Sequence, residues 1–255
     1  MAPDPRPKIT STTTDRVATI TIDAPPVNAL GPAEWVALRS AVDDVSNDRE
    51  VRALVIQGTP GRFCAGADIA ILAEPTDEEA RMLTLVGDAA AAIRRCRVPA
   101  ICAVDGAAHG GGLELALACD IRVASGKATF AASGVNMGLI ASVPALNAAV
   151  GTTRAGLMLL TGKPIDANQA AAWALASLLD NDAATRAQQI ANELADKAPL
   201  AVEANKVAMR SVGSLSFEEH EQIVTSLFSS LERSADHREA VDAFLTKRPP
   251  TFTRS

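Results

Sequence analysis

The sequence predicts an α/β fold in which strands and helices alternate over most of the chain. Runs rich in β-branched and apolar residues, such as Val17 to Ile22 and Val51 to Gln57, alternate with stretches of helical periodicity. From about residue 182 onward the strand signals stop and only helical patterns follow. Glycine-rich bends join two apolar strands to the stretches after them, which is typical of strand–turn–helix units. The 255 residues suffice for one large domain.

The N-terminal elements follow from local patterns. Residues 1–8 are proline-rich and predict a disordered lead. Apolar residues alternate with threonines over Val17 to Ile22, which predicts a strand that ends at Pro25 and Pro26. Helical spacing then predicts a helix with one buried face, formed by Trp35, Leu38, Val42 and Val45.

The middle of the chain repeats this order. Val51 to Gln57 is almost wholly apolar, so we expect a strand covered on both faces. Thr76 to Glu79 has the pattern of a capping box and predicts the start of a long helix, which Pro99 ends. Ala100 to Val104 then predicts a second buried strand.

The remaining elements are shorter or purely helical. Ile121 to Ala124 and Ala128 to Ala131 predict short strands, and Ser133 to Val143 predicts a loop. Helical patterns follow at Thr153 to Leu160, Asp182 to Lys197, Leu200 to Ser211, Phe217 to Arg233 and Asp236 to Leu245. We expect a core over residues 9–195 and a helical region over residues 196–255.

Composition and charge exclude several classes of protein. The net charge is −6 and the basic residues are scattered, which argues against a nucleic-acid partner. No apolar run reaches the ~18 residues that a membrane span needs, and the N-terminus lacks a signal-peptide pattern. Cys64, Cys96, Cys102 and Cys119 lie in apolar surroundings without metal-ligand spacing, which indicates buried reduced thiols. We therefore expect a cytoplasmic protein without a membrane partner.

Two glycine-containing bends carry the candidate chemistry. The first is Phe63-Cys64-Ala65-Gly66-Ala67-Asp68-Ile69, and the second runs from Asp105 through Gly110-Gly111-Gly112 to Glu114 and Ala116. A helix start offers backbone N–H donors, and a carboxylate one turn further on can act as a base. Such a place can stabilise an oxyanion beside the group that creates it.

These two motifs, in this order, resemble the crotonase family of enoyl-CoA hydratases and isomerases. Asn28-Ala29-Leu30, the segment from Leu160 to Ala167 with Trp173, and the end from Ala243 to Pro250 support the resemblance, which covers almost the whole chain. It implies a spiral of strand–strand–helix units followed by a C-terminal helical trimerisation region. It also implies an acyl-CoA thioester as partner, a homotrimer or dimer of trimers, and no metal or cofactor beyond the coenzyme A of the substrate.

The resemblance also assigns roles to residues of the first bend and of the second. The backbone N–H groups of Ala67 and Gly111 would bind the thioester oxygen and stabilise its enolate. Ala65, Asp68 and Ile69 would contact the adenine end of coenzyme A. For Asp68, a role as the cap of a short helix is compatible with this contact.

Glu114 matches one of the two glutamates with which the hydratases activate water, and the second glutamate is absent. Aligning Phe130 and Gly138 with the family pattern places Gly134 at its position, and no acidic residue occurs between Asp120 and Asp166. A single acid/base favours isomerase-like or divergent chemistry over efficient hydration. The alternative is an acyl-CoA-binding homologue with little or no turnover.

Several polar residues have a plain structural interpretation beside a functional one. Glu114 could simply be a carboxylate that the helix dipole stabilises near the start of a helix. The two glycine motifs make a catalytic base the stronger interpretation. For His109 a satisfied structural side chain ranks first, and Asn136 is equally well explained as a turn residue. Lys206 and Lys247 could meet coenzyme A phosphates or be ordinary exposed lysines on helices.

Overall fold

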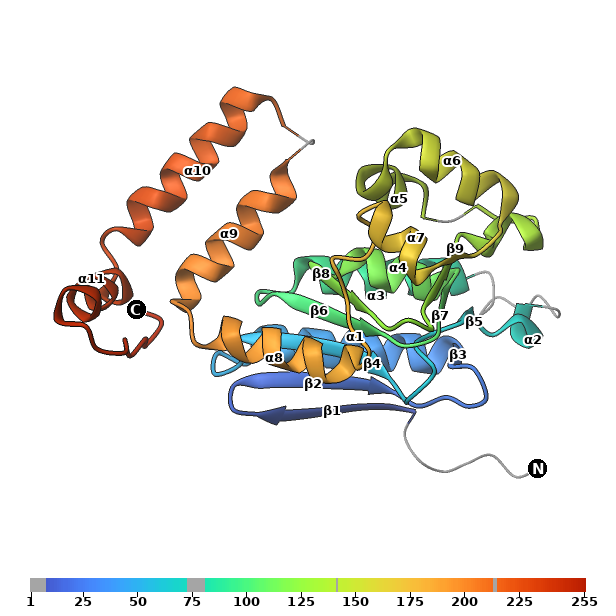
Figure 1. The fold of residues 1–255 in the computed structure, drawn as a ribbon, viewed down its shortest axis with the longest axis horizontal. Helices are drawn as coiled ribbons and strands as arrows, with labels where there is room; N and C mark the ends of the chain where they lie inside the picture. The colour runs from blue at the N-terminus through green and yellow to red at the C-terminus, as the bar shows by residue number, and fades with distance from the viewer. Residues whose placement is uncertain (1–7, 73–80, 141, 213–214) are drawn as a thin grey trace.

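A six-stranded sheet runs through the N-terminal part of the protein, and most of its strands can be followed in Figure 1. In the computed structural model, which describes residues 8–72, 81–140, 142–212 and 215–255, the strand order is β1-β2-β4-β6-β8-β11. β1 and β2 are antiparallel, and all other neighbours are parallel. The strands are β1 (Ile9–Thr14), β2 (Val17–Ile22), β4 (Ala53–Gly58), β6 (Ala100–Val104), β8 (Ile121–Ala124) and β11 (Leu178–Leu179).

Helices cover both faces of this sheet, as the apolar strands predict. Leu54 and Ile56 of β4 belong to a core shared with α1 (Pro32–Asn47), α3 (Met82–Arg95) and α4 (Gly111–Ala118). Ala53 and Val55 of the same strand point the other way, into a core shared with α8 (Ala183–Ala195). The alternation of side chains along β4 therefore serves two separate cores.

Two smaller sheets connect the ends of these elements. β3 (Ala29–Leu30) pairs in parallel with β5 (Gly66–Ala67). β9 (Thr129–Ala131) lies between β7 (Ala107–His109) and β10 (Ile165–Asp166). The order strand, strand, helix thus recurs: α2 (Ile69–Leu72) and then α3 follow β4 and β5, and α4 follows β6 and β7. The predicted α/β class is confirmed.

The predicted helices and cysteines agree with the structure. The buried residues of α1 are Trp35, Leu38, Val42 and Val45, the four that helical spacing predicted. The shorter helices are α2 (Ile69–Leu72), α5 (Val143–Val150), α6 (Thr152–Thr161) and α7 (Ala167–Ala172). All four cysteines are buried with free thiols, and burial raises the pKa of Cys64 to about 12.

Several elements of the structure are absent from the sequence prediction, among them β1, η1 (Ser133–Met137) and the helix α5. Ile9–Thr14 is a strand, although its polar residues show no apolar alternation, because it is an edge strand that is exposed over most of its length. Ser133 to Val143 was predicted to be a loop, which is wrong for Ser133–Met137, a 3-10 helix (η1). Of the predicted lead, residues 1–7 lie outside the described residues, as does the capping-box pattern at Thr76 to Glu79.

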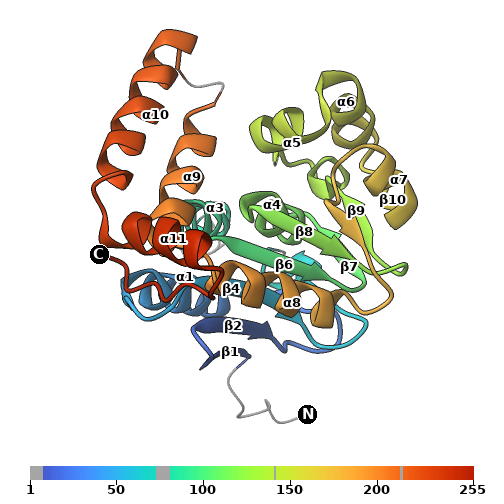
Figure 2. The ribbon, with the colours of Figure 1, turned by 60° about the vertical axis from the view of Figure 1, so that its left-hand side comes forward.

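The C-terminal region is helical and extends away from the sheet (Figures 1 and 2). It comprises α9 (Pro199–Ser211), α10 (Phe217–Leu231) and α11 (Ala235–Thr246). α9 and α10 lie side by side, and α10 buries none of its residues within this chain. The helical region expected beyond residue 182 is confirmed.

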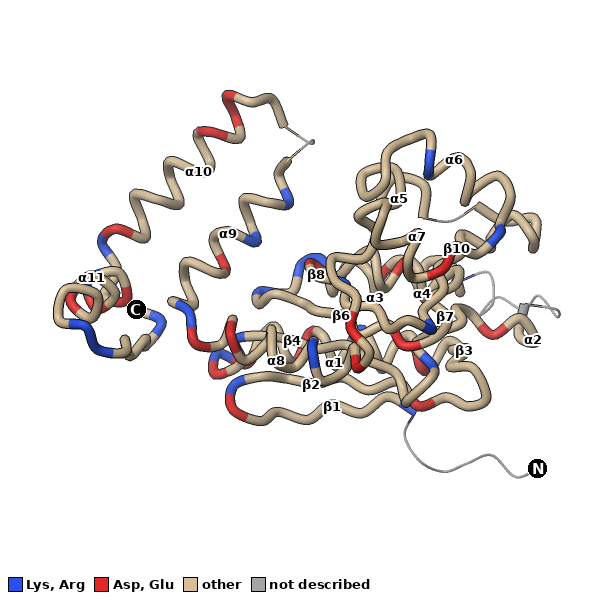
Figure 3. The backbone as a smooth tube through the Cα atoms, viewed as in Figure 1, with Lys and Arg blue, Asp and Glu red and all other residues tan. Residues whose placement is uncertain are grey.

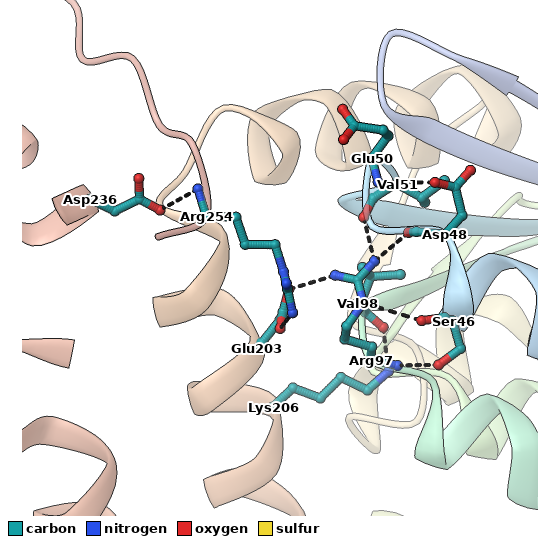
Figure 4. A network of polar contacts seen from close by, with 10 residues as sticks. All are labelled: Ser46, Asp48, Glu50, Val51, Arg97, Val98, Glu203, Lys206, Asp236 and Arg254. Carbon is teal, nitrogen blue, oxygen red and sulfur yellow. Dashed lines mark hydrogen bonds and ion pairs between the residues drawn. The ribbon is translucent and has the colours of Figure 1, made fainter. Parts of the chain in front are cut away.

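A polar network attaches α9 to the core (Figure 4). The carboxylate of Glu203 accepts hydrogen bonds from Arg97 at 2.5 Å and from Arg254 at 2.9 Å. Arg97 also donates to the backbone carbonyls of Ser46, Asp48 and Val51. Glu203 therefore connects α9 with the loop before β6 and with the C-terminal tail.

Lys and Arg are interspersed with Asp and Glu along the backbone, with no long block of one sign (Figure 3). Within the part of the chain that the structure describes, no helix is both long and apolar enough to cross a membrane.

Candidate active site

The candidate site is an open, largely apolar cavity. The lining residues come from the two glycine bends, from α3 and α4, and from η1 and the segment after it. They are Ala65, Ala67, Ile69, Met82, Leu83, Val86, Gly110, Gly111, Glu114, Ser133, Gly134, Met137, Leu139 and Ile140.

Backbone contacts hold the two glycine bends together. Cys64 donates from its N–H to the carbonyl of Ala107 at 2.9 Å, and its own carbonyl accepts from His109 at 3.2 Å. A Cβ atom on Gly66 would lie only 2.9 Å from the backbone nitrogen of Gly111. The first bend therefore rests directly on the start of α4.

At each glycine of the triplet Gly110-Gly111-Gly112, a different steric feature disfavours a side chain. Gly110 has φ of +50°, a backbone conformation that L side chains rarely adopt. A Cβ on Gly111 would lie 3.0 Å from the ring of Trp35, and a Cβ on Gly112 only 1.9 Å from the carbonyl oxygen of Cys64. The triplet is thus what allows α4 to begin against the first bend.

The side chain of Asn28 stabilises the first bend through hydrogen bonds to the backbone. Its side chain is fully buried, accepts from the N–H of Ala24 at 2.8 Å, and donates to the carbonyls of Ile22 and Phe63, each at 3.0 Å. It thereby ties the segment before β3 to the segment before β5, the two strands that pair with each other. The sequence showed Asn28 only as part of a motif, and its side-chain role follows from the structure.

Ala67 and Gly111 both line the cavity. Gly111 is the first residue of α4, a position whose N–H has no partner within the helix. The structure thus brings together the two residues proposed to form an oxyanion hole, and their role stays a prediction.

Glu114 lies in the first turn of α4 and is the one acidic residue among the described residues that line the cavity. Its side chain is 18% exposed. One carboxylate oxygen, Oε2, accepts a short hydrogen bond from the hydroxyl of Ser142, and the other, Oε1, lies 4.0 Å from Nη1 of Arg94. Ser142 was not among the residues singled out from the sequence, because it lies in a stretch without a recognisable motif.

Gly134 lies in η1 and also lines the cavity. The wall on which the family pattern predicts a second glutamate therefore carries no side chain at this position. Its neighbours there are Ser133, whose hydroxyl is neutral, and the apolar residues Met137, Leu139 and Ile140. The described wall thus provides one carboxylate in an apolar setting.

The other predicted binding residues separate into two groups. Ala65 and Ile69 line the cavity, and the Ile69 residue is 59% exposed. Asp68 is not among the lining residues, and its carboxylate accepts from the N–H of Ala70 at 3.0 Å. The structure therefore supports the capping interpretation of Asp68, and the contact of all three with coenzyme A stays a prediction.

Three further candidates have structural partners. His109 Nε2 lies 3.0 Å from the hydroxyl of Thr129, and burial lowers the pKa of His109, which fits a satisfied structural side chain. Asn136 donates to the carbonyl of Gly162 at 3.2 Å. Lys206 is buried and pairs with Asp120, so its interpretation as an ordinary exposed lysine is wrong, and its ammonium group already has a protein partner.

Relatives of known name match nearly the whole chain. A protein of Bacillus subtilis described as a probable enoyl-CoA hydratase is 34% identical over 244 residues, covering 92% of this chain and 95% of its own. One of Mycobacterium tuberculosis with the same description is 38% identical over 214 residues, covering 80% of this chain and 83% of its own.

Solved structures show the same fold. DspI of Pseudomonas aeruginosa superposes with a TM-score of 0.92 at 32% identity, covering 99% of both chains. An enoyl-CoA hydratase from Bacillus anthracis superposes with a TM-score of 0.94 at 25% identity, covering 98% of this chain and 100% of its own. The enoyl-CoA hydratase/isomerase family model matches residues 12–255. The protein therefore belongs to the enoyl-CoA hydratase/isomerase family and has the crotonase fold.

Proposed function

We propose that the protein is an acyl-CoA enzyme that uses Glu114 as a single acid/base. The observation that carries this proposal is the placement of Glu114, Ala67 and Gly111 on one apolar cavity that contains no second carboxylate among its described residues. The reaction uses coenzyme A as part of the substrate and needs no metal or further cofactor.

In the proposed reaction, the backbone N–H groups of Ala67 and Gly111 bind the oxygen of the thioester. Glu114 takes a proton from an acyl carbon, and the electron pair moves toward that oxygen to form an enolate. Donors aimed at such a developing charge each contribute about 2.7–4 kcal/mol to lowering the barrier. Since both donors belong to the backbone, small residues at these positions leave room for the substrate.

The absence of a second carboxylate favours double-bond migration over hydration. Adding water across a double bond works best with two carboxylates that share the water, one activating it and the other delivering its proton. Moving a double bond requires one group that takes a proton and returns it to another carbon of the same acyl chain. Glu114 can perform both halves of that transfer, and we expect an isomerase-like activity.

A second candidate function is acyl-CoA binding without turnover. Gly134 and the apolar residues Met137, Leu139 and Ile140 favour this alternative, because they provide binding surface and no acid/base group. Both candidates share the ligand and differ in whether Glu114 transfers a proton.

The deciding experiment compares wild type with Glu114→Gln on 2-enoyl-CoA and 3-enoyl-CoA substrates. We expect wild type to isomerise the 3-enoyl-CoA, and the variant to bind acyl-CoA normally while losing about 10²–10⁴-fold in kcat. If neither protein turns over any enoyl-CoA but both bind it, the enzyme function fails and the binding function stands.

We also propose that the C-terminal helices form a homotrimer or dimer of trimers. α10 exposes large apolar residues to solvent, among them Phe217, which is 74% exposed, and Phe228, which is 66% exposed. Exposed apolar surface of this kind is characteristic of protein interfaces. Light scattering coupled to size-exclusion chromatography tests this assembly, and a monomer at micromolar concentration would exclude it.

A further inference from the structure

We propose that Ser142 is the positioning residue of the acid/base group: its hydroxyl holds one oxygen of Glu114 so that the other faces the reacting carbon. This inference rests on the proposed function. Its basis is the hydrogen bond that the Ser142 hydroxyl donates to Oε2 of Glu114, between residues 28 positions apart in the sequence.

The bond lies in a largely buried setting. Ser142 is 7% exposed, and the side chain of Glu114 is 18% exposed. A hydrogen bond between a hydroxyl and a carboxylate is stronger than a neutral one, and water competes for it less when both groups are shielded. The carboxylate therefore has a defined orientation before a substrate arrives.

The backbone of Ser142 is arranged for this contact and not for capping a helix. Ser142 precedes α5, where a serine hydroxyl ordinarily accepts from a backbone N–H of the first turn. No such bond forms here, because Ser142 adopts a left-handed conformation with φ of +60° and ψ of +9°. Unfavourable backbone conformations of this kind cluster at functional sites, where surrounding contacts maintain them.

The fold brings Ser142 to the site through two contacts. α5 packs against α4, the helix that carries Glu114. Just before Ser142, the N–H of Leu139 donates to the carbonyl of Gly134 at 2.9 Å. The segment after η1 therefore returns over the cavity wall that lacks the second glutamate and places a hydroxyl on the remaining one.

The chemistry of a hydroxyl limits Ser142 to positioning. It donates a hydrogen bond to the carboxylate but carries no charge, so it does not replace a second acid/base. The other oxygen, Oε1, lies 4.0 Å from Arg94 Nη1, and the Arg94 side chain is 43% exposed. Solvent screens this ion pair, which leaves Oε1 as the oxygen that takes the proton and returns it.

The test removes the Ser142 hydroxyl in two ways. Ser142→Gly deletes it and adopts the left-handed backbone without cost, whereas Ser142→Ala deletes it and keeps the Cβ atom. We expect both variants to lose about 10- to 100-fold in kcat, because a hydrogen bond to a charged group is removed. We expect the Kd for a saturated acyl-CoA to stay within about twofold of wild type, because the bond orients the base and does not touch the bound acyl group.

The same substitutions in a Glu114→Gln background separate the possible explanations. We expect Ser142→Gly to cause no further loss there, since its effect acts through the carboxylate. If Ser142→Gly keeps the wild-type kcat, or if it lowers kcat by the full factor again in the Glu114→Gln background, the role of Ser142 is overturned. The proposed function of Glu114 is not affected by either result. The proposed function is overturned if Glu114→Gln turns over the substrate as fast as wild type, or if wild type is inactive on all enoyl-CoA substrates. In either case the role of Ser142 is overturned as well.

Discussion

Lys206 in α9 forms an ion pair with Asp120, which follows the end of α4. Its Nζ lies 2.7 Å from Oδ2 of the carboxylate. Lys206 also donates to the carbonyl of Val98 at 2.7 Å, and the N–H of Ala100 donates to the same oxygen of Asp120. The C-terminal helical region is thereby anchored to the helix on which Gly111 and Glu114 lie.

Replacing Lys206 by Ala should destabilise the fold. The Lys206 side chain is only 4% exposed, and breaking a buried pair typically costs about 3–5 kcal/mol because the remaining charge loses its partner. Urea denaturation measures the loss, with Lys197→Ala at an exposed position of the same region as control. An equal effect of the two substitutions would show that the ion pair contributes nothing.

The Glu203 network should make stability depend on pH in the acid range. Burial alone raises the pKa of Glu203, but hydrogen bonds from Arg254 and Arg97 outweigh it and hold the pKa below the ordinary 4.5. Because the folded-state pKa is depressed, the stabilisation is fully present above pH 4.5 and disappears as the pH falls through the lower folded-state value.

Glu203→Gln tests this linkage. At pH 7 we expect the variant to be about 2 kcal/mol less stable, since the three hydrogen bonds that the carboxylate accepts from Arg97 and Arg254 are weakened. The difference from wild type should shrink as the pH falls below 4.5, where the wild-type carboxylate becomes protonated. Denaturant titrations from pH 7 to 3 follow the difference, and a constant gap would contradict the assignment.

Restoring a carboxylate at Gly134 should add hydratase activity. Gly134→Glu places a second acid/base on the cavity that Glu114 also lines, and we expect kcat/KM for 2-enoyl-CoA hydration to rise about 10-fold or more. Gly134→Gln has the same length without the charge and is the matched control. Equal hydration by the two variants would mean that the added charge does not reach the water.

Gly112 should tolerate no side chain. A Cβ atom there would lie 1.9 Å from the Cys64 carbonyl oxygen, so Gly112→Ala must push α4 away from the first bend. We expect a loss of about 1–3 kcal/mol in stability together with reduced turnover. Gly87→Ala in α3 is the control, because nothing lies within 4 Å of the added methyl group, and alanine there should stabilise by about 0.5–1 kcal/mol. Comparable stability of the two variants would show that the bend adapts.

Sequence reasoning identified the α/β class, most helices and the central strands, because these depend on periodicity within one segment. The buried face of α1 and the two-sided burial of β4 are examples. It missed β1, whose polar edge position produces no apolar alternation, and η1, whose short run has no helical repeat.

The sequence by itself predicted the core of the candidate site, since its two glycine bends and Glu114 are local motifs. Only the tertiary structure decided what surrounds them. Ser142 reaches Glu114 through the packing of α5 on α4, and Lys206 turns inward to Asp120 instead of remaining exposed. The reason is physical: hydrogen bonds between distant segments depend on how whole elements pack, and no pattern within a single segment records that packing.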